Sequence, residues 1–509
     1  MRVVRTSELL QGGRIASVRK DVVKFASSIK SDRRLLKSVI KINEAHVAMM
    51  MEQKIIEWSD GAKLLQALSE LKSKMKLKPS LEDVHMAVEE EVVKKVGPEI
   101  GGNLHIAKSR NDQVATAIRM ELRENLVGIT TSVFGLQEAL TKLSEEHVRT
   151  VVPGYTHLQP AQPVTFAHYL LSHVDGLERD FQRLEEAYKR VNLCPMGAGA
   201  LATSSFQINR ERIAELLGFS EVLENSVDAV SSRDFVLETM AFLTIIAVGI
   251  SRLVEDLIVW SSPDFGVIEL PDRFSSTSSI MPQKKNPDVL EVIRARMSHT
   301  LGNLVTSVTT MKALPSSYNL DFQEITPRLW ESLENITSSL NMLSKLVANL
   351  KVSKNVFSKP HLSFSASTEL ANMLLRKYKI PFRTAHKIVG SLIKILTEYK
   401  LALDDVTPEL LQKVIQDSSG ISLKINIEDI REATDPLKIV KSHNVRGGPS
   451  PIEVKRMLKI RKKWIVLARS KLSEKRRKLK EAEDGLQSVV QSYSSSDNAS
   501  IAKLKNPNG

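Results

Sequence analysis

The sequence predicts an all-α protein organised around a central bundle of long helices, and three observations support this prediction. Proline is absent from three long stretches, 196–262, 288–314 and 328–359. Within them apolar residues recur every three or four positions, as on one helical face, whereas the alternating pattern of strands is scarce. Helices of roughly 25–30 residues exceed the usual globular length and are typical of helical bundles.

Taken in order, the chain divides into four parts. Residues 1–105 contain expected helices with polar, lysine-rich faces, and residues 106–355 contain the long apolar helices. Residues 356–470 contain shorter helices separated by prolines. Residues 471–509 form a basic and polar tail, rich in serine and asparagine towards its end, which we expect to be partly disordered.

The composition indicates a cytoplasmic protein. Of its 509 residues 42% are hydrophobic, and the single cysteine, Cys194, excludes an intrachain disulfide and suits a reducing compartment. The N-terminal residues lack the apolar core of a signal peptide. The most apolar helical stretch, 240–250, is too short to cross a bilayer, so we expect no membrane association.

The formal charge of +13 is concentrated in one place. Residues 451–480 carry thirteen Lys or Arg and two Glu, so the rest of the chain is close to neutral. This distribution predicts a basic C-terminal helix rather than a basic groove through the fold. Nucleic-acid binding by that helix is an alternative, but a solvated helix or one packed against other helices is the simpler interpretation.

The stretch SSIMPQKKNPD, residues 278–288, has the composition of an anion-binding loop. Its Asn-Pro-Asp step predicts a helix start, with Asn286 as the N-cap and proline at the first helical position. Such an N-terminus beside Lys284 and Lys285 favours an anion, and Ser278 and Ser279 are candidate mobile nucleophiles or bases. Taken alone, the stretch is better explained as a solvated loop before a capped helix.

Three further polar stretches lie where helices are expected to begin or end. VVPGYTHLQPAQP places Thr156 and His157 on a turn rich in glycine and proline, where a histidine is more often functional than on an apolar helix face. KSRNDQV heads a helix, and PSSYNLDFQE bends between two long helices. A structural histidine and an ordinary polar cap are the alternatives. The sequence contains neither metal-ligand spacing nor a nucleotide-binding glycine motif.

Together these stretches resemble the fumarase/aspartase superfamily of lyases, and the QKKNP ending is similar to that of its argininosuccinate lyase branch. KSRNDQV, PGYTHLQPAQP, NSVDAVSSRDFVLE and LPSSYNLDFQE follow in family order, between KFASSI and VRGGPSP. The resemblance covers about residues 20–465. Several matched blocks in one order make it far more specific than a single motif.

The resemblance implies a subunit of three helical domains and a homotetramer in which each active site is built from blocks of three subunits. It implies a cytoplasmic carbon–nitrogen lyase without a cofactor, which cleaves argininosuccinate reversibly to L-arginine and fumarate in arginine biosynthesis. The chemistry is a β-elimination. A base removes a proton from the carbon next to a carboxylate, and an acid assists departure of the guanidino nitrogen.

The resemblance also implies roles for individual residues. Ser278 matches the catalytic base, and Lys284 matches the lysine that holds a substrate carboxylate and helps ionise the serine. His157 matches the acid-side residue and Glu291 its charge partner. His85 lies in a block near the site. The implied substrate-binding residues are Ser28, Arg110, Asn111, Thr156, Asn286, Tyr318 and Gln323.

The sequence departs from the family pattern at three places. Thr277 replaces a glycine before the serine pair, and HIAK at 105–108 replaces the usual H-T-G-R. Thr326 replaces a lysine that helps to bind the amino-acid end of the substrate. We expect Pro327 to interrupt the helix there, so that Arg328 can bind the substrate carboxylate in a bidentate manner instead.

These departures keep other functions open. A related lyase could release fumarate from another N-substituted aspartate, and Thr326 favours that alternative. A non-catalytic member of the family with a structural role is disfavoured, because Ser278, Lys284, His157 and Glu291 are all present.

Overall fold

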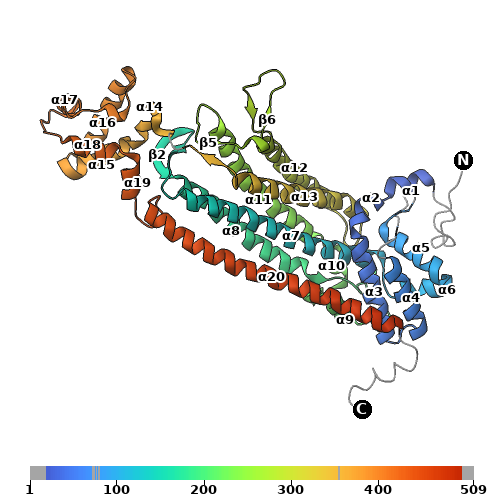
Figure 1. The fold of residues 1–509 in the computed structure, drawn as a ribbon. Helices are drawn as coiled ribbons and strands as arrows, with labels where there is room; N and C mark the ends of the chain where they lie inside the picture. The colour runs from blue at the N-terminus through green and yellow to red at the C-terminus, as the bar shows by residue number, and fades with distance from the viewer. Residues whose placement is uncertain (1–18, 72–74, 76, 78–80, 354–355, 496–509) are drawn as a thin grey trace, which may run out of the picture.

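The computed structural model describes residues 19–495 except 72–74, 76, 78–80 and 354–355. Its central part is a bundle of long helices that run roughly side by side (Figure 1), which confirms the predicted all-α class. The long helices are α7 (Arg110–Glu146), α8 (Phe166–Val191), α11 (Asp234–Ser261), α12 (Asp288–Met311) and α13 (Phe322–Val347). α7 packs against α8 and α13, and α12 packs against α11 and α13.

Smaller helices cover one end of the bundle, to the right in Figure 1. They are α1 (Lys20–Ala26), α2 (Ile29–Asp32), η2 (Arg33–Leu35), α3 (Leu36–Glu52), α4 (Trp58–Leu71), α5 (Val84–Val96), α6 (Pro98–Gly102), η3 (Asn103–His105), α9 (Arg210–Leu216) and α10 (Ser226–Ser231).

A second group of short helices lies at the opposite end and has a hydrophobic core of its own, formed by residues between Ala366 and Ile439. These helices are η5 (Val356–Ser358), α14 (Pro360–Ser363), η6 (Phe364–Ala366), α15 (Ser367–Tyr378), α16 (Phe382–Glu398), η7 (Leu403–Asp405), α17 (Pro408–Ser419), α18 (Ile427–Thr434) and α19 (Pro436–Ser442). The expected domain boundaries stay predictions.

The strands of the described chain are short. β1 (Val151–Thr156) and β2 (Gln159–Thr165) form an antiparallel hairpin at the end of the bundle. The sequence was interpreted there as a proline-rich turn, and the pairing was not predicted. The other strands are two residues long: β3 (Leu193–Cys194) with β4 (Glu221–Val222), β5 (Ile268–Glu269) with β8 (Lys351–Val352), and β6 (Ser276–Thr277) with β7 (Lys285–Asn286); η4 (Asp272–Phe274) precedes β6.

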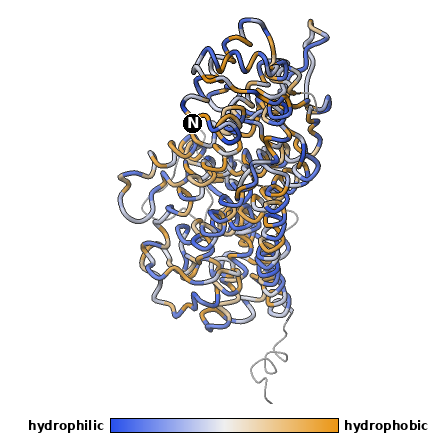
Figure 2. Tube along the Cα trace, turned by 90° about the vertical axis from the view of Figure 1, so that its left-hand side faces the viewer, coloured by the Kyte–Doolittle hydropathy of each residue, from blue (hydrophilic) through white to orange (hydrophobic). Residues whose placement is uncertain are grey.

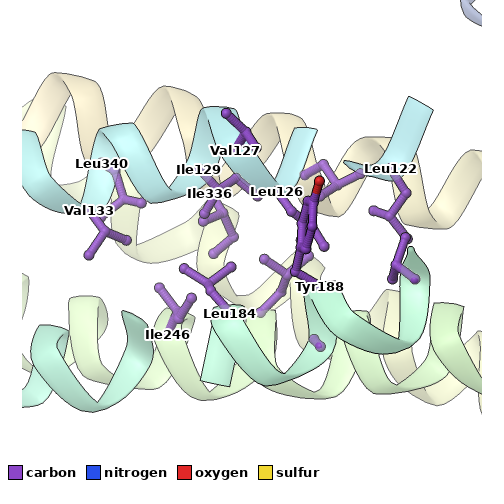
Figure 3. Close-up of a cluster of buried hydrophobic side chains, with 14 of the residues drawn as sticks. Leu122, Leu126, Val127, Ile129, Val133, Leu184, Tyr188, Ile246, Ile336 and Leu340 are labelled. Carbon is purple, nitrogen blue, oxygen red and sulfur yellow. The ribbon is translucent and has the colours of Figure 1, made fainter. Parts of the chain in front are cut away.

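The bundle core is made where apolar stripes of four helices meet (Figure 3). Four helices contribute to the cluster in Figure 3. They are α7 with Leu126, Ile129 and Val133, α8 with Leu184 and Tyr188, α11 with Ile246, and α13 with Ile336 and Leu340. Burying each such side chain contributes about 1.5–3 kcal/mol, so packing rather than helix propensity fixes these long elements. Hydrophobic and hydrophilic residues are interspersed along the chain (Figure 2). No described helix is long and apolar enough to cross a membrane.

The last helix, α20 (Pro451–Ser495), corrects the prediction for the tail. We predicted a basic helix over residues 451–480 and expected residues 471–509 to be partly disordered, but α20 continues to Ser495 and packs along α8, α7, α9, α3 and α4. Many of its cations form ion pairs within the chain; Arg461 binds Asp175 at 2.7 Å and Lys475 binds Glu185 at 2.5 Å. Residues 496–509 lie outside the described part.

Two predicted helix boundaries also need correction. α12 begins at Asp288, with Pro287 rather than Asn286 in the capping position, because Asn286 is drawn into the β6–β7 pair. Pro327 does not interrupt α13, which continues through it from Phe322 to Val347. In an α-helix, residues i and i+2 lie about 200° apart around the axis. Arg328 therefore points away from Thr326.

Candidate active site

The lengths of α7 and α12 separate the candidate residues of one chain. At about 1.5 Å per residue, the 37 residues of α7 span about 55 Å between Arg110 at its start and the β1–β2 hairpin beyond its end. The 24 residues of α12 span about 36 Å between its first turn, which contains Glu291, and the bend that contains Tyr318. The candidate residues therefore fall into separate groups.

The first group lies where α7 begins. Ser109 caps the helix in a capping box with Asp112, within the stretch KSRNDQV that was expected to head a helix. The buried Asp112 carboxylate also accepts the N–H groups of Gly197 and Gly199, at 3.1 and 2.9 Å. Burial raises the pKa of Asp112 to about 6 despite these hydrogen bonds. Asn111 donates to the carbonyl of Ala200 at 3.0 Å, so the 197–200 turn is fixed against the start of α7.

Around this helix start the structure brings together several expected substrate-binding residues. Arg110 forms an ion pair with Asp83, and Ser28 donates a hydrogen bond to Asp32. Burial raises the pKa of Tyr318, which is hydrogen-bonded to Gln323 and lies within electrostatic range of Arg233, Asp83 and Asp32. Ser28, Arg110, Asn111, Tyr318 and Gln323 thus belong to one polar cluster, named below the α7-start cluster.

Two carboxylates of the α7-start cluster were missed from the sequence. Asp83 caps α5, accepting the N–H of Met86 at 2.7 Å, and its side chain is only 8% exposed. Burial raises the pKa of Asp32 to about 6. Asp32 lies just beyond the matched block KFASSI, and Asp83 lies in LEDVHMA, the block that contains His85. Acidic residues beside apolar positions are common in caps, so sequence alone did not single them out.

Arg233 was also missed, although it lies in the matched stretch NSVDAVSSRDFVLE, directly before α11. Its side chain is 1% exposed, and its guanidinium lies 4.7 Å from the ring centroid of Phe322. One nitrogen donates to the carbonyls of Val230 and Ser232, at 3.2 and 2.7 Å. Within the described part of the chain, Nε and the second terminal nitrogen have no hydrogen-bond partner. Burial lowers its pKa to about 10, so it stays cationic at neutral pH.

His85 is buried and not a surface base. It lies on α5, and burial lowers its pKa to about 3, so that it is neutral at physiological pH. Its two ring nitrogens are both shielded from solvent. The structure therefore places His85 behind the α7-start cluster.

The second group is the tip of the β1–β2 hairpin. His157 and Leu158 have positive φ angles, 55° and 57°, in the left-handed region. At the base of the tip Tyr155 packs against Trp260 and Phe265, with ring centroids 6.4 and 5.2 Å apart. This geometry presents Thr156 and His157 to solvent at the end of the bundle.

The third group is the loop that β6 and β7 hold at its base, projecting from the bundle in Figure 1. Ser278 accepts the N–H of Met281 at 3.1 Å, and Ile280 is 83% exposed. Asn286 donates to Ser276 at 3.4 Å across the β6–β7 pair, so it supports the loop base. Lys284 is exposed on this loop, close in sequence to the first turn of α12.

The three groups are complementary in chemistry but separate in one chain. His157 lies at the tip of the hairpin, Lys284 lies on the β6–β7 loop, and Glu291 lies in the first turn of α12. Arg328 is 46% exposed and lies 3.6 Å from Glu331. Among the described residues, no group of three or more His, Cys, Asp or Glu side chains could hold a metal ion.

Comparison with known proteins gives a consistent result. Residues 17–302 match the family described as Lyase, and residues 364–441 match the family described as Argininosuccinate lyase C-terminal. The argininosuccinate lyase of Methanocaldococcus jannaschii is 43% identical, over 94% of this chain and 98% of its own. That of Methanosarcina mazei is 40% identical, over 96% and 99%.

Solved structures share the fold. The crystal structure of EDDS lyase in complex with formate superposes with a TM-score of 0.85 at 30% identity, covering 91% of this chain and 92% of that one. A class II fumarase from Schistosoma mansoni superposes with a TM-score of 0.69 at 17% identity, covering 87% of this chain and 100% of that one. At this lower identity the likeness extends to the fold alone.

Proposed function

The chain belongs to the argininosuccinate lyase family, within the fumarase/aspartase superfamily, and from this premise we propose that it cleaves argininosuccinate reversibly to L-arginine and fumarate in arginine biosynthesis. The observation that carries the proposal is 43% identity to an argininosuccinate lyase over 94% of the chain. Release of fumarate from argininosuccinate, followed by its absorbance, tests it. The proposed reaction takes place in the cytoplasm and uses no cofactor.

In the proposed mechanism Ser278 is the base. Its ionised oxygen removes a proton from the carbon next to a substrate carboxylate, and the electron pair forms the double bond of fumarate as the carbon–nitrogen bond breaks. The departing guanidino nitrogen takes a proton from the acid side of the site, where His157 and its partner Glu291 act. Lys284 stabilises the negative charge that develops on the substrate carboxylate when the proton is removed. Preorganised cations lower the barrier most where charge develops.

The proposed active unit is a homotetramer in which three subunits contribute to each site. Separation of about 55 Å along α7 favours this arrangement, because His157 and Arg110 of one chain cannot reach one substrate. α12 also has a second apolar stripe that its own chain leaves open: Leu301, Val305 and Val308 are 51%, 57% and 46% exposed. Ile245 and Val248 of the adjacent α11 are similarly exposed. Apolar faces of this kind mark protein interfaces.

The α7-start cluster would bind the arginine half of the substrate. Asp32 and Asp83 supply carboxylates that suit a guanidinium or ammonium group, and Ser28, Asn111, Tyr318 and Gln323 supply polar contacts. A carboxylate at that end needs a cation, because burying it unpaired is costly. Arg233 is the better candidate than Arg328, since two of its nitrogens are buried without partners beside Phe322.

A second candidate function is release of fumarate from another N-substituted aspartate. Thr326 favours it, because the lysine expected there is absent and Thr326 instead bonds the carbonyl of Phe322 at 3.2 Å. Comparing turnover of argininosuccinate with that of other succinyl amines separates the two functions.

A further inference from the structure

The C-terminal half of α20 crosses the N-terminal helices and is fixed to them by apolar contacts. Leu472, Leu486 and Val490 are 5%, 3% and 3% exposed and belong to the main hydrophobic core. Ala482 lies so close to Gly218 that a Cβ added to this glycine would come within 2.6 Å of the Ala482 Cβ. This part of α20, residues 472–493, is named the strap below; Figure 1 shows it passing α9, α3 and α4.

The end of the strap is anchored where α3 ends and α4 begins. The Tyr493 hydroxyl donates to Glu52 at 3.0 Å, and its ring centroid lies 4.8 Å from that of Trp58. Glu52 also accepts hydrogen bonds from two side-chain nitrogens of Arg212 in α9, each at 3.0 Å. The strap therefore connects three elements of the N-terminal end of the fold.

Glu483 is the charged contact between the strap and the first half of α3. Its carboxylate lies 3.1 Å from the Lys37 nitrogen and 3.0 Å from the Lys41 nitrogen. Burial favours the neutral acid, but hydrogen bonds from Lys41 and Lys37 outweigh it and lower the pKa of Glu483 to about 2. The side chains of Lys41 and Glu483 are 12% and 32% exposed, so water screens this bridge less than an ordinary surface pair.

Apolar packing is incomplete beside this bridge. A cavity of about 380 Å³ lies between α3 and the strap, lined by residues that include Arg33, Ile40, Glu483 and Leu486. Because side chains leave this space open, the two ion pairs of Glu483 carry much of the connection there.

The bridge is rigidly connected to the α7-start cluster. Residues 29–52 form α2, η2 and α3 in unbroken succession and contain no glycine or proline, so movement of α3 is transmitted to Asp32 and Ser28. Asp32 precedes Lys37 by little more than one helical turn. On the other side Arg34 holds the same junction, at 3.1 Å from Glu334 and 3.4 Å from Glu121.

We propose that the strap positions Ser28 and Asp32 for the arginine half of the substrate, and that Glu483 is its positioning residue, acting through Lys37 and Lys41. Glu483 does not touch substrate, and the roles of Ser28 and Asp32 rest on the proposed function. The strap thus supports the binding site from behind α3 without touching substrate, although its sequence is that of a charged tail.

Glu483→Gln tests the proposal, with Asp484→Asn as a matched control on the same helix. Asp484 is exposed and pairs with Lys480 of α20, so its change leaves α3 untouched. We expect Glu483→Gln to raise KM for argininosuccinate and weaken inhibition by arginine roughly three- to tenfold. We expect kcat and inhibition by fumarate to stay within about twofold. Amide hydrogen exchange over residues 29–36 should become faster, and Asp484→Asn should change none of these values.

Two further variants complete the test. Glu483→Asp keeps the negative charge but places it farther from the lysines of α3, because the side chain is shorter. It should give an intermediate rise in KM. The exchanged pair Glu483→Lys with Lys41→Glu should restore KM and slow exchange in part, relative to Glu483→Lys alone, because it rebuilds the bridge to position 41 but leaves Lys37 beside the new lysine. Unchanged exchange over residues 29–36, or an unchanged KM when exchange is faster, would overturn the proposal. If the unmodified protein lacked lyase activity, the proposed function would fail, and the exchange measurement would still decide whether Glu483 fixes α3.

Discussion

Arg110 begins α7 and His157 follows its far end, so about 55 Å of one continuous helix lies between them. A single chain therefore cannot bring the two residues to one small substrate. In the proposed site the α7-start cluster would supply contacts for an amino acid, and the β6–β7 loop would supply a serine and lysines. We infer that these groups meet only between subunits.

Complementation between inactive variants tests this sharing. His157→Asn and Lys284→Ala subunits, denatured and refolded together, should recover part of the activity, because some sites in mixed tetramers receive only intact groups. Ser278→Ala mixed with Lys284→Ala is the control, since both lesions lie on one loop and should not complement. Equal recovery in the two mixtures, or none in verified mixed tetramers, would argue against shared sites.

The open stripe of α12 should be required for assembly. Val305 is 57% exposed there, and Val305→Glu places a charge in the proposed interface. We expect dissociation to smaller species by light scattering, with at least a tenfold loss of activity, because a buried unpaired charge costs several kcal/mol. Val466→Glu is the control, at a valine that is 70% exposed on α20. An intact Val305→Glu tetramer would contradict the proposed interface.

Arg233 should determine binding of the amino-acid end. Arg233→Gln removes the cation that would pair with the substrate carboxylate, so KM for argininosuccinate should rise on the order of ten- to a hundredfold. Inhibition by arginine should weaken in parallel, whereas inhibition by fumarate should change little. Arg328→Ala is the control and should leave both constants nearly unchanged, because Arg328 faces solvent. If Arg328→Ala raised KM and Arg233→Gln did not, Arg328 would be the partner of the substrate carboxylate.

Asp32 should make arginine binding depend on pH. Burial raises the pKa of Asp32 to about 6, so its negative charge is present above that pH and is lost as the pH falls through it. Arginine remains a cation throughout, and its inhibition should therefore weaken up to tenfold for each unit below pH 6. Asp32→Asn should weaken inhibition at every pH and remove this dependence. An unchanged pH profile in Asp32→Asn would assign the titration to another group.

Much of the fold followed from local chemistry. The polar stretch KSRNDQV was expected at the head of a helix, which is the start of α7, and proline-free apolar runs predicted α11 and α12. Pro327 was misjudged because its cost, about 3 kcal/mol in a helix interior, is offset by burial of neighbours such as Leu329 and Trp330. Tertiary packing decided that element against its local preference.

The length of α20 was missed for a different reason. Its second half is highly charged, and composition alone suggested a tail. Leu472, Leu479 and Leu486 nevertheless recur every seven residues, which is a helical seam. That spacing was the available signal for a packed helix.

The candidate site was predictable in residue type but not in arrangement. Matched blocks identified Ser278, His157 and Arg110, yet no local pattern shows that a long helix separates them. Arg233 and Asp32 were missed because an Arg or Asp in a sequence carries no mark of burial. Their importance depends on which elements pack around them.

The most direct test of the central claim is the formation of fumarate by the purified protein given argininosuccinate. We predict steady release of fumarate with equimolar arginine, and a loss of roughly 10²–10⁴ in rate in Ser278→Ala, with substrate still bound. Ser279→Ala, purified in the same way, should retain most of the activity. No fumarate from argininosuccinate, together with release from another N-substituted aspartate, would contradict the proposed substrate, and full turnover by Ser278→Ala would contradict the proposed base.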